Sequence, residues 1–131
     1  MKIVVIDGQG GKMGAAIIQE LRSGHIDANI VAVGTNSAAT GTMLSARPSA
    51  GATGENAVIV NCRDADYIIG PIGILVADAL HGEITPVMSV AIGQSAGKKI
   101  LVPVNRCNTN VLGVQDHALG DYIKMIPAQI K

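Results

Sequence analysis

The sequence is poor in aromatic side chains: it contains no tryptophan and no phenylalanine, and its two tyrosines are Tyr67 and Tyr122. The core must therefore be built from alanine, valine, isoleucine, leucine and methionine. Hydrophobic residues make up 48% of the chain, which is enough apolar material for it to fold unaided. Because 131 residues is the length of one typical domain, we predict a single domain over residues 1–131 and no separate substrate domain.

Neither sign of charge is in excess, since Lys and Arg together number 10 and Asp and Glu together number 10. Without a basic run, we expect neither nucleic acid nor an anionic membrane surface as a partner. No apolar run approaches the roughly 18 residues that a membrane span needs. The apolar run at residues 3–6 is too short for a signal peptide. These absences predict a soluble, cytoplasmic protein.

Cysteine is also scarce, and Cys62 and Cys107 lack the close spacing of metal ligands. A cytosolic chain of this size seldom depends on a disulfide, so we expect two thiols and no metal site. The sequence contains no GxSxG nucleophile elbow, no P-loop GK[ST] and no HExxH. The sequence therefore lacks the central motifs that would indicate a serine hydrolase, a P-loop ATPase or a zinc protease.

Glycine, by contrast, is abundant, with 16 residues, and it separates apolar runs from segments with helical spacing. Residues 3–6 are apolar without alternation, as in a strand covered on both faces. We predict strands at residues 3–6, 30–33, 49–53, 67–69, 100–104 and 111–114, and helices at residues 13–24, 38–46, 54–62, 74–80, 85–96 and 116–130. This alternation predicts an α/β fold: a doubly wound, mainly parallel, Rossmann-like sheet whose strand order is left open.

The most specific motif is a glycine-rich turn between the first strand and the first helix. It consists of Asp7, Gly8, Gln9, Gly10, Gly11, Lys12, Met13 and Gly14. We expect Gly8 to allow the turn, Gly10 or Gly11 to let backbone amides approach a phosphate, and Gly14 to let the helix pack on the sheet. The amides and the helix dipole favour an anion there. The alternative is that these glycines only make a tight connection from strand to helix.

The spacing of these glycines departs from the GxGxxG pattern, because Met13 stands where its third glycine would fall. Taken as GxxGxxG, with Gly8, Gly11 and Gly14, the turn resembles the cofactor loops of dihydrodipicolinate reductases and prephenate dehydrogenases, and Lys12 and Met13 match those loops too. The resemblance covers about the first quarter of the chain and implies a nicotinamide cofactor. It does not imply either reaction, since both enzymes need a second domain.

Over its whole length the chain resembles an uncharacterised bacterial family known only as a domain of unknown function. The segments that carry this resemblance are IDGQGG at residues 6–11, GTN at 34–36, GATGENA at 51–57, IIGPIG at 68–73 and NRC at 105–107. The resemblance implies a Rossmann-like fold and supplies no activity.

The end of the second predicted strand bears on which dinucleotide binds. An NAD-binding unit usually offers Asp or Glu there, whereas this chain has Thr35, Asn36 and Ser37. These side chains, with Lys12, favour the 2′-phosphate of NADP over NAD. The alternative is that Asn36 and Ser37 cap the next helix.

The predicted wall of the cleft comes from segments later in the chain, beyond the predicted strands at residues 67–69 and 100–104. We expect cofactor contacts from Gly70, Pro71, Ile72 and Gly73, and substrate contacts from His81, Glu83, Asn105, Arg106 and Asn108. His81 and Glu83 would supply an acid and a base if their loop folds over the cleft. The alternative roles are a strand end for the glycines, a surface ion pair for Arg106 and a solvated turn for His81 and Glu83.

The leading hypothesis is a small domain that binds a nicotinamide dinucleotide, NADP before NAD, with its activity as an oxidoreductase undecided. One alternative is a non-enzymatic nucleotide sensor or partner-binding subunit. Another is a protein that binds a different phosphorylated ligand, such as coenzyme A or AMP. A domain this small has few residues for the walls of a substrate site, so we also expect a homodimer.

Overall fold

The computed structural model describes residues 1–104 and 107–131. Its centre is a parallel sheet of 5 strands in the order β3-β2-β1-β4-β5. The strands are β1 (Lys2–Asp7), β2 (Asn29–Gly34), β3 (Ala50–Thr53), β4 (Tyr67–Pro71) and β5 (Lys98–Val102). The expected α/β doubly wound fold is confirmed, and the strand order, which the sequence left open, reverses direction between β1 and β4.

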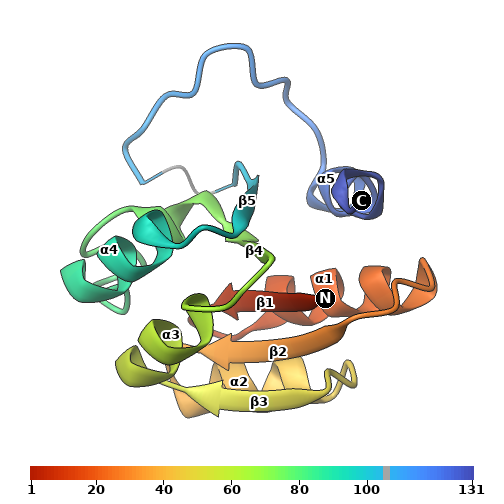
Figure 1. Cartoon of the computed structure of the whole chain (residues 1–131). Coiled ribbons are helices and arrows are strands. Elements are labelled where there is room, and N and C mark those ends of the chain that lie inside the picture. Colours follow the sequence, from red (N-terminus) through yellow and green to blue (C-terminus); the bar gives the residue numbers. More distant parts are fainter. Residues whose placement is uncertain (105–106) are drawn as a thin grey trace.

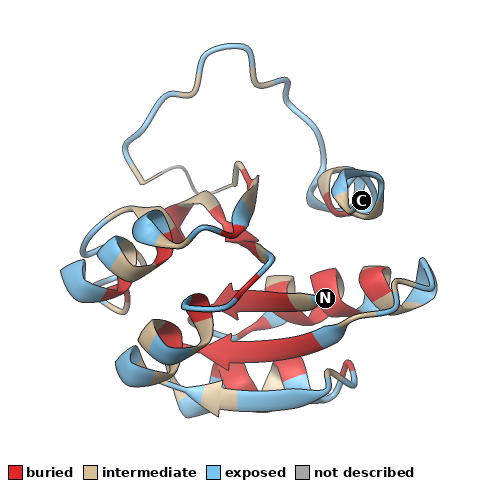
Figure 2. Cartoon of the chain, viewed as in Figure 1, coloured by how far each residue is buried: buried red, intermediate tan, exposed pale blue. Residues whose placement is uncertain are grey.

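Helices cover both faces of the sheet (Figure 1). The helices are α1 (Lys12–Ser23), α2 (Ser37–Leu44), α3 (Glu55–Cys62), α4 (Pro86–Gln94) and α5 (Leu119–Lys124), with short 3-10 turns η1 (Ile72–Leu75) and η2 (Pro127–Gln129). The helices α1, α2 and α5 pack with Ile3 and Val5 on one face, and α3 and α4 pack with Val4 and Ile6 on the other. Successive residues of β1 thus serve opposite cores, and Figure 2 shows this strand buried.

Several helix ends follow from local signals in the sequence. Asn36 caps α2 by accepting a hydrogen bond from the amide of Ala39 at 2.8 Å. Thr85 caps α4 by accepting from the amide of Met88, and Pro86 occupies the first helical position. Gly24 ends α1 as expected.

Three local predictions were wrong. Residues 74–80 form no α-helix, since η1 is followed by turns in which Asp78 and Leu80 have positive φ. Residues 111–114 form no strand. The strand β4 also does not stop at Gly70 but continues through Pro71, which pairs with Val102 of β5. Proline is tolerated there because β1 pairs only with residues 67–69, so no neighbour on that side needs its missing donor.

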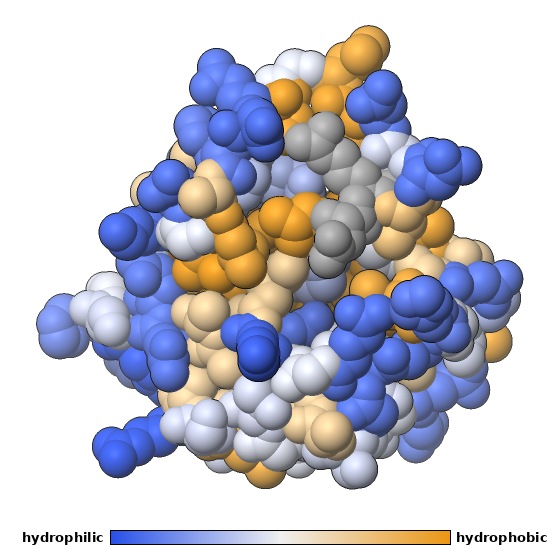
Figure 3. Space-filling model, turned by 180° about the vertical axis from the view of Figure 1, so that it is seen from behind, coloured by the Kyte–Doolittle hydropathy of each residue, from blue (hydrophilic) through white to orange (hydrophobic). Residues whose placement is uncertain are grey.

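The C-terminal segment returns to the sheet after a long loop. Residues 107–118 swing outward before α5, which packs against α1 and β5 (Figure 1). Pro127 follows the end of this helix, so the helix predicted over residues 116–130 is shorter than expected and stops early, as the proline indicated. On the reverse face, hydrophobic side chains gather near the centre and hydrophilic ones lie around them (Figure 3).

Candidate functional site

The candidate site lies at the carboxyl ends of β1, β2 and β4, where the strand order reverses. In open α/β sheets this is where ligands bind, because the loops on either side of the reversal diverge and leave a crevice. The glycine-rich turn after β1 and the Thr35–Asn36 segment after β2 both lie at this edge. The topology therefore brings together two of the segments that the sequence singled out.

The Asp7 side chain, at the end of β1, fixes the glycine-rich turn by accepting hydrogen bonds from its backbone. This buried side chain accepts hydrogen bonds from the amides of Gly8 and Gly14, each at 2.8 Å, and so ties the start of the turn to the first turn of α1. Burial raises the pKa of Asp7, the negative charge of Glu83 raises it further, and the two amide hydrogen bonds oppose the shift. The carboxyl group thus acts as a fixed internal acceptor.

Glu83 lies over the same turn and accepts hydrogen bonds from two separate loops. Its Oε1 atom receives the amide of Gln9 at 2.9 Å, the hydroxyl of Thr35 at 2.7 Å and the Nδ2 group of Asn36 at 2.7 Å. Desolvation raises the pKa of Glu83, but these hydrogen bonds and the nearby His81 together outweigh it and leave the pKa below its ordinary value. Three donors converging on one carboxylate oxygen make a cradle for negative charge.

The segment that carries Glu83 is a compact turn rather than a helix. The amide of Asp78 donates to the carbonyl of Ile84 at 2.7 Å, and the amide of Ile84 donates to the carbonyl of Ala79 at 3.2 Å. Leu80, His81 and Gly82 have positive φ, which lets the chain reverse direction within a few residues. Buried Ile84 anchors the turn next to Glu83.

The glycines of the turn mostly face the protein's own atoms. A Cβ atom added at Gly11, which has a φ of 75°, would lie 2.5 Å from the carbonyl oxygen of Ala39, and one at Gly14 would lie 2.4 Å from the sulfur of Met43. A Cβ at Gly8 would lie 2.7 Å from the hydroxyl of Thr35. Of the four glycines in the turn, Gly10 alone has no described atom within 4 Å of the added Cβ. Gly8, Gly11 and Gly14 are thus explained by internal packing, and Gly10 is the open position.

Part of the backbone of the turn remains available to a ligand. The amides of Gly8 and Gly14 donate to Asp7, that of Gln9 donates to Glu83, and that of Gly11 donates to the carbonyl of Gly8 at 3.0 Å. Within the described part of the chain, the amides of Gly10, Lys12 and Met13 donate no hydrogen bond. Lys12 is exposed and Met13 is half-buried at the start of α1. The open amides adjoin the cradle that holds Glu83.

The contacts of the residues after β2 change the case for NADP that was based on the sequence. That argument rested on the absence of a carboxylate beside Thr35, Asn36 and Ser37, yet Glu83 places one there from a distant part of the chain. Asn36 caps α2 and also donates to Glu83, and Ser37 is exposed at the first position of α2. The premise that no carboxylate lies beside these residues is therefore wrong, and the preference for NADP over NAD loses the observation on which it rested.

The other predicted wall residues are distributed unevenly. Gly70 lies in β4, buried against the Ile6 carbonyl, and the space beside Gly73 is taken by the sulfur of Cys107. Pro71 is buried, Ile72 is half-buried, and both His81 and Asn108 are exposed. Asn105 and Arg106 lie outside the described residues. Of the predicted substrate residues, the structure therefore brings Glu83 to the glycine-rich turn by direct contact.

Among the described residues, neither Cys62 nor Cys107 takes part in a disulfide. Burial raises the pKa of Cys62 to about 11, although Lys2 and Lys99 act to lower it, so this thiol stays protonated at neutral pH. In residues 1–104 and 107–131 no group of three or more His, Cys, Asp or Glu side chains is placed to hold a metal ion. Within the same ranges no helix has the length and hydropathy to cross a membrane.

Comparisons with known proteins extend over nearly the whole chain. A family model described as a domain of unknown function (DUF3842) matches residues 2–131. No curated protein matches. The crystal structure of a dodecameric FMN-dependent UbiX-like decarboxylase from Escherichia coli O157:H7 is similar with a TM-score of 0.51 at 19% sequence identity, covering 98% of this chain and 75% of the decarboxylase chain. At this identity the likeness shows the fold.

Proposed function

The chain belongs to the DUF3842 family, and we propose that it binds a phosphorylated, nucleotide-like ligand at the carboxyl ends of β1, β2 and β4. Flavin mononucleotide is the first candidate, ahead of nicotinamide dinucleotides, coenzyme A and AMP. The anionic group of the ligand would enter the cradle that Glu83 occupies. The proposal rests mainly on the three hydrogen bonds that Gln9, Thr35 and Asn36 donate to a single carboxylate oxygen of Glu83.

This cradle supports an anion site because its donors come from different parts of the chain. One is a backbone amide of the turn after β1, and two are side chains after β2. Donors held by rigid elements keep their positions when one acceptor replaces another. A phosphate oxygen needs the same kind of donors as a carboxylate oxygen, and the open amides of Gly10 and Lys12 would donate hydrogen bonds to the other oxygens of the phosphate.

Glu83 would have to leave the cradle as the ligand enters. A phosphate beside the carboxylates of Glu83 and Asp7 would face two negative charges, and no lysine or arginine pairs with either carboxylate in the described residues. Glu83 lies on a surface turn and is half-buried, so it can move outward more easily than buried Asp7. Binding is thus an exchange of one anion for another.

The fold comparison supports the choice of ligand class. The similar decarboxylase is FMN-dependent and dodecameric, and it shares the parallel sheet. We therefore place a flavin nucleotide first and also propose a homo-oligomer for this chain. We assign no reaction: binding without turnover, as in a nucleotide sensor, uses the same cradle.

The test is a binding titration with a matched pair of glycine variants. Wild-type protein is titrated with FMN, NADPH, NADH, coenzyme A and AMP by calorimetry, and quenching of flavin fluorescence gives a second readout for FMN. Gly10→Leu should weaken binding at least tenfold, because its side chain would fill the open space above the turn. Gly41→Leu is the control, since Gly41 is also exposed with equally open surroundings but lies on α2.

Two results would contradict the proposal. One is that none of the five ligands binds wild-type protein at millimolar concentration. The other is that a ligand binds but Gly10→Leu and Gly41→Leu leave its affinity equally unchanged, which would place the ligand elsewhere on the molecule.

A further inference from the structure

The strand β5 forms one edge of the sheet and leaves part of its backbone unpaired. It pairs with β4 on one side and with no described strand on the other. The amide of Lys98 donates to the carbonyl of Asp66, so Lys98 and every second residue after it direct their backbone groups toward β4. The backbone groups of Lys99 and Leu101 therefore point away from the sheet, and their amides donate to no acceptor among the described residues. Such an edge is open to one more strand.

A groove of about 320 Å³ lies along this free edge of β5. Residues 98–103 line one side of the groove, and the C-terminal segment lines the other with Tyr122, Met125, Ile126 and Gln129. Met125 is 46% exposed although its side chain is apolar. A strand edge beside a helix is an arrangement that takes up an extended segment, because the edge supplies main-chain hydrogen bonds and the groove receives alternate side chains.

The loop before α5 carries a short segment whose chemistry suits this groove. Leu112 in this loop is 94% exposed, the highest value of any large apolar side chain in the described residues. Val114 follows Leu112 after one glycine, and Asp116 is exposed. Neither Asp116 nor exposed Lys98 of β5 forms an ion pair within the described part of the chain. The segment thus offers two apolar side chains and a carboxylate at alternate positions.

One antiparallel register matches this segment to β5 in both charge and hydropathy. It places one acidic side chain opposite a basic one and two apolar side chains opposite apolar ones. The facing pairs are Asp116 with Lys98, Val114 with Ile100, and Leu112 with Val102. Ile100 and Val102 point to the α5 side of the sheet, so the apolar side chains of the segment would point into the groove. The β5 residues of these pairs direct their backbone toward β4, and such non-hydrogen-bonded pairs bring side chains closest together.

The same register also satisfies the free backbone groups of β5. Lys99 comes opposite Gln115 and Leu101 comes opposite Gly113, and residues opposed in this way exchange two hydrogen bonds in an antiparallel pair. A shift by one residue would turn the apolar side chains of the segment away from the groove. Charge, hydropathy and hydrogen bonding therefore select the same register.

We propose that residues 111–116 of one copy of this chain add to the free edge of β5 in a second copy, and that the exchange is reciprocal. Within one chain the end of this segment is held on α5, since the Tyr122 hydroxyl donates to the Gln115 carbonyl and accepts from the amide of His117. Residues 107–118 swing outward from the sheet (Figure 1). In a two-fold dimer each copy gives one segment and one groove, so the free edge of β5 is covered in both copies.

This contact specifies the homo-oligomer proposed above and does not depend on which ligand binds. The groove lies beside β5 and α5, whereas the cradle of Glu83 lies at the carboxyl ends of β1 and β2. Ligand binding and association are measured separately, so the failure of one leaves the other standing. Because a short segment enters each groove, we expect a dimer that dissociates on dilution rather than an obligate one.

Sedimentation velocity from about 5 µM to about 500 µM tests the contact. Wild-type protein should change from monomer to dimer as the concentration rises. Lys98→Glu and Asp116→Lys should each weaken the dimer roughly tenfold, because each places like charges opposite one another in both contacts. Asp27→Lys is the matched control, since Asp27 is also exposed but lies before β2, and it should leave dimerisation unchanged. Circular dichroism checks that all variants fold, as expected for exposed positions.

Mixing the two charge variants separates exchange between copies from pairing within one chain. In an equimolar mixture of Lys98→Glu and Asp116→Lys, the two native charges meet in one contact of the dimer and the two introduced charges meet in the other. Both contacts then join opposite charges, so the mixture should dimerise about as strongly as wild type. The double variant Lys98→Glu/Asp116→Lys should dimerise by itself for the same reason.

Three outcomes would overturn the inference. Wild-type protein that remains a monomer over the whole range shows that no exchange takes place, and it removes the proposed homo-oligomer as well. A dimer that both charge variants leave intact uses another surface, and the homo-oligomer then stands without this contact. Dimerisation that the double variant recovers but the mixture does not would assign residues 111–116 to the groove of their own chain.

Discussion

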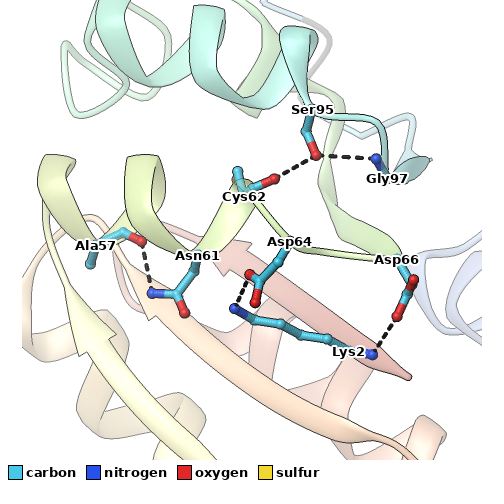
Figure 4. A network of polar contacts seen from close by, with 8 residues as sticks. All are labelled: Lys2, Ala57, Asn61, Cys62, Asp64, Asp66, Ser95 and Gly97. Carbon is cyan, nitrogen blue, oxygen red and sulfur yellow. Dashed lines mark hydrogen bonds and ion pairs between the residues drawn. The ribbon is translucent and has the colours of Figure 1, made fainter.

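The carboxylates at the two ends of the sheet have different kinds of partner. At the amino end, the Nζ atom of Lys2 pairs with Asp64 at 2.5 Å, and the amide of Lys2 donates to Asp66 at 2.8 Å (Figure 4). Here one acidic side chain has a cation beside it, and both lie at the surface. At the carboxyl end, Asp7 and Glu83 accept only neutral donors. In the described residues neither of these two carboxylates has a basic side chain within ion-pair distance.

We infer from this difference that the amino end is structural and that the carboxyl end is the candidate functional end. At the amino end, Ser95 also joins the end of α3 to the segment before β5. Its hydroxyl donates to the Cys62 carbonyl at 2.6 Å and accepts from the amide of Gly97 at 3.1 Å (Figure 4). These contacts satisfy backbone groups of Cys62 and Gly97, and they hold no carboxylate that a ligand anion could replace. At the carboxyl end, amide and hydroxyl dipoles hold a carboxylate that another anion can replace. The carboxylates without a basic partner thus lie at the edge where we propose that the ligand binds.

The largest difference is expected between Asp7→Ala and Asp64→Ala. Removing the Asp7 carboxyl leaves the amides of Gly8 and Gly14 without an acceptor in a buried place, which should lower the free energy of unfolding by roughly 2–5 kcal/mol. Asp64→Ala removes an exposed ion pair and should have no measurable effect. Urea denaturation of both variants checks this comparison. Equal losses at the two ends would contradict it.

A second comparison lies inside the glycine-rich turn. Gly11→Ala should destabilise the protein by roughly 2–3 kcal/mol, because it combines a positive φ with a contact to the Ala39 backbone. Gly10→Ala, in open space, should change stability by less than about 0.5 kcal/mol. Thermal unfolding of the two variants under the same conditions measures the difference. If the two glycines prove equally tolerant, Gly11 does not pack against α2 as described.

Glu83→Gln tests the hydrogen bonds of the cradle through their dependence on pH. Because the pKa of Glu83 is lower in the folded protein than its ordinary value of 4.5, the carboxylate stabilises the fold above that pH and loses this contribution as the pH falls. At pH 7 the variant should be less stable by about 1 kcal/mol. The difference from wild type should shrink as the pH falls below 4.5 and disappear once the carboxyl group is protonated in the folded protein as well. A difference that grows on acidification would mean that Glu83 is not held as a carboxylate.

The smallest effect is expected at the amino end. Lys2→Met keeps an apolar stem and the backbone hydrogen bond to Asp66, and it removes only the ion pair with Asp64. Because such exposed pairs contribute little, the melting temperature should match that of wild type at low and at high salt. A clear loss of stability at low salt alone would show that this end depends on charge as well.

The sequence predicted those parts of the fold that short-range signals determine. The apolar run of β1, the Asn36 cap of α2 and the Thr85–Pro86 start of α4 each depend on residues close together in the chain, and each was confirmed. The turn that carries Glu83 was predicted as the end of a helix and the loop after it, because apolar residues 74–80 suit a buried helix. Their φ angles depend on packing against distant parts of the chain, which periodicity does not record.

The site itself was predicted only in part for the same reason. The turn after β1 and the Thr35–Asn36 segment could be placed at one edge of the sheet, since parallel strands end together. The contacts of Glu83 span 74 residues to Gln9 and 48 to Thr35. A single Glu in a loop gives no local sign of such contacts. The preference for NADP lost its support at this point, because it counted only the residues next to the strand and not Glu83.

The most direct test of the account is the effect of Glu83→Ala on the affinity for FMN. If the phosphate takes the place of the Glu83 carboxylate, removing that carboxylate abolishes the competition and the repulsion, and the variant should bind FMN at least tenfold more tightly than wild type. Weaker binding by Glu83→Ala would contradict the account, because it would mean that Glu83 contacts the ligand rather than giving way to it.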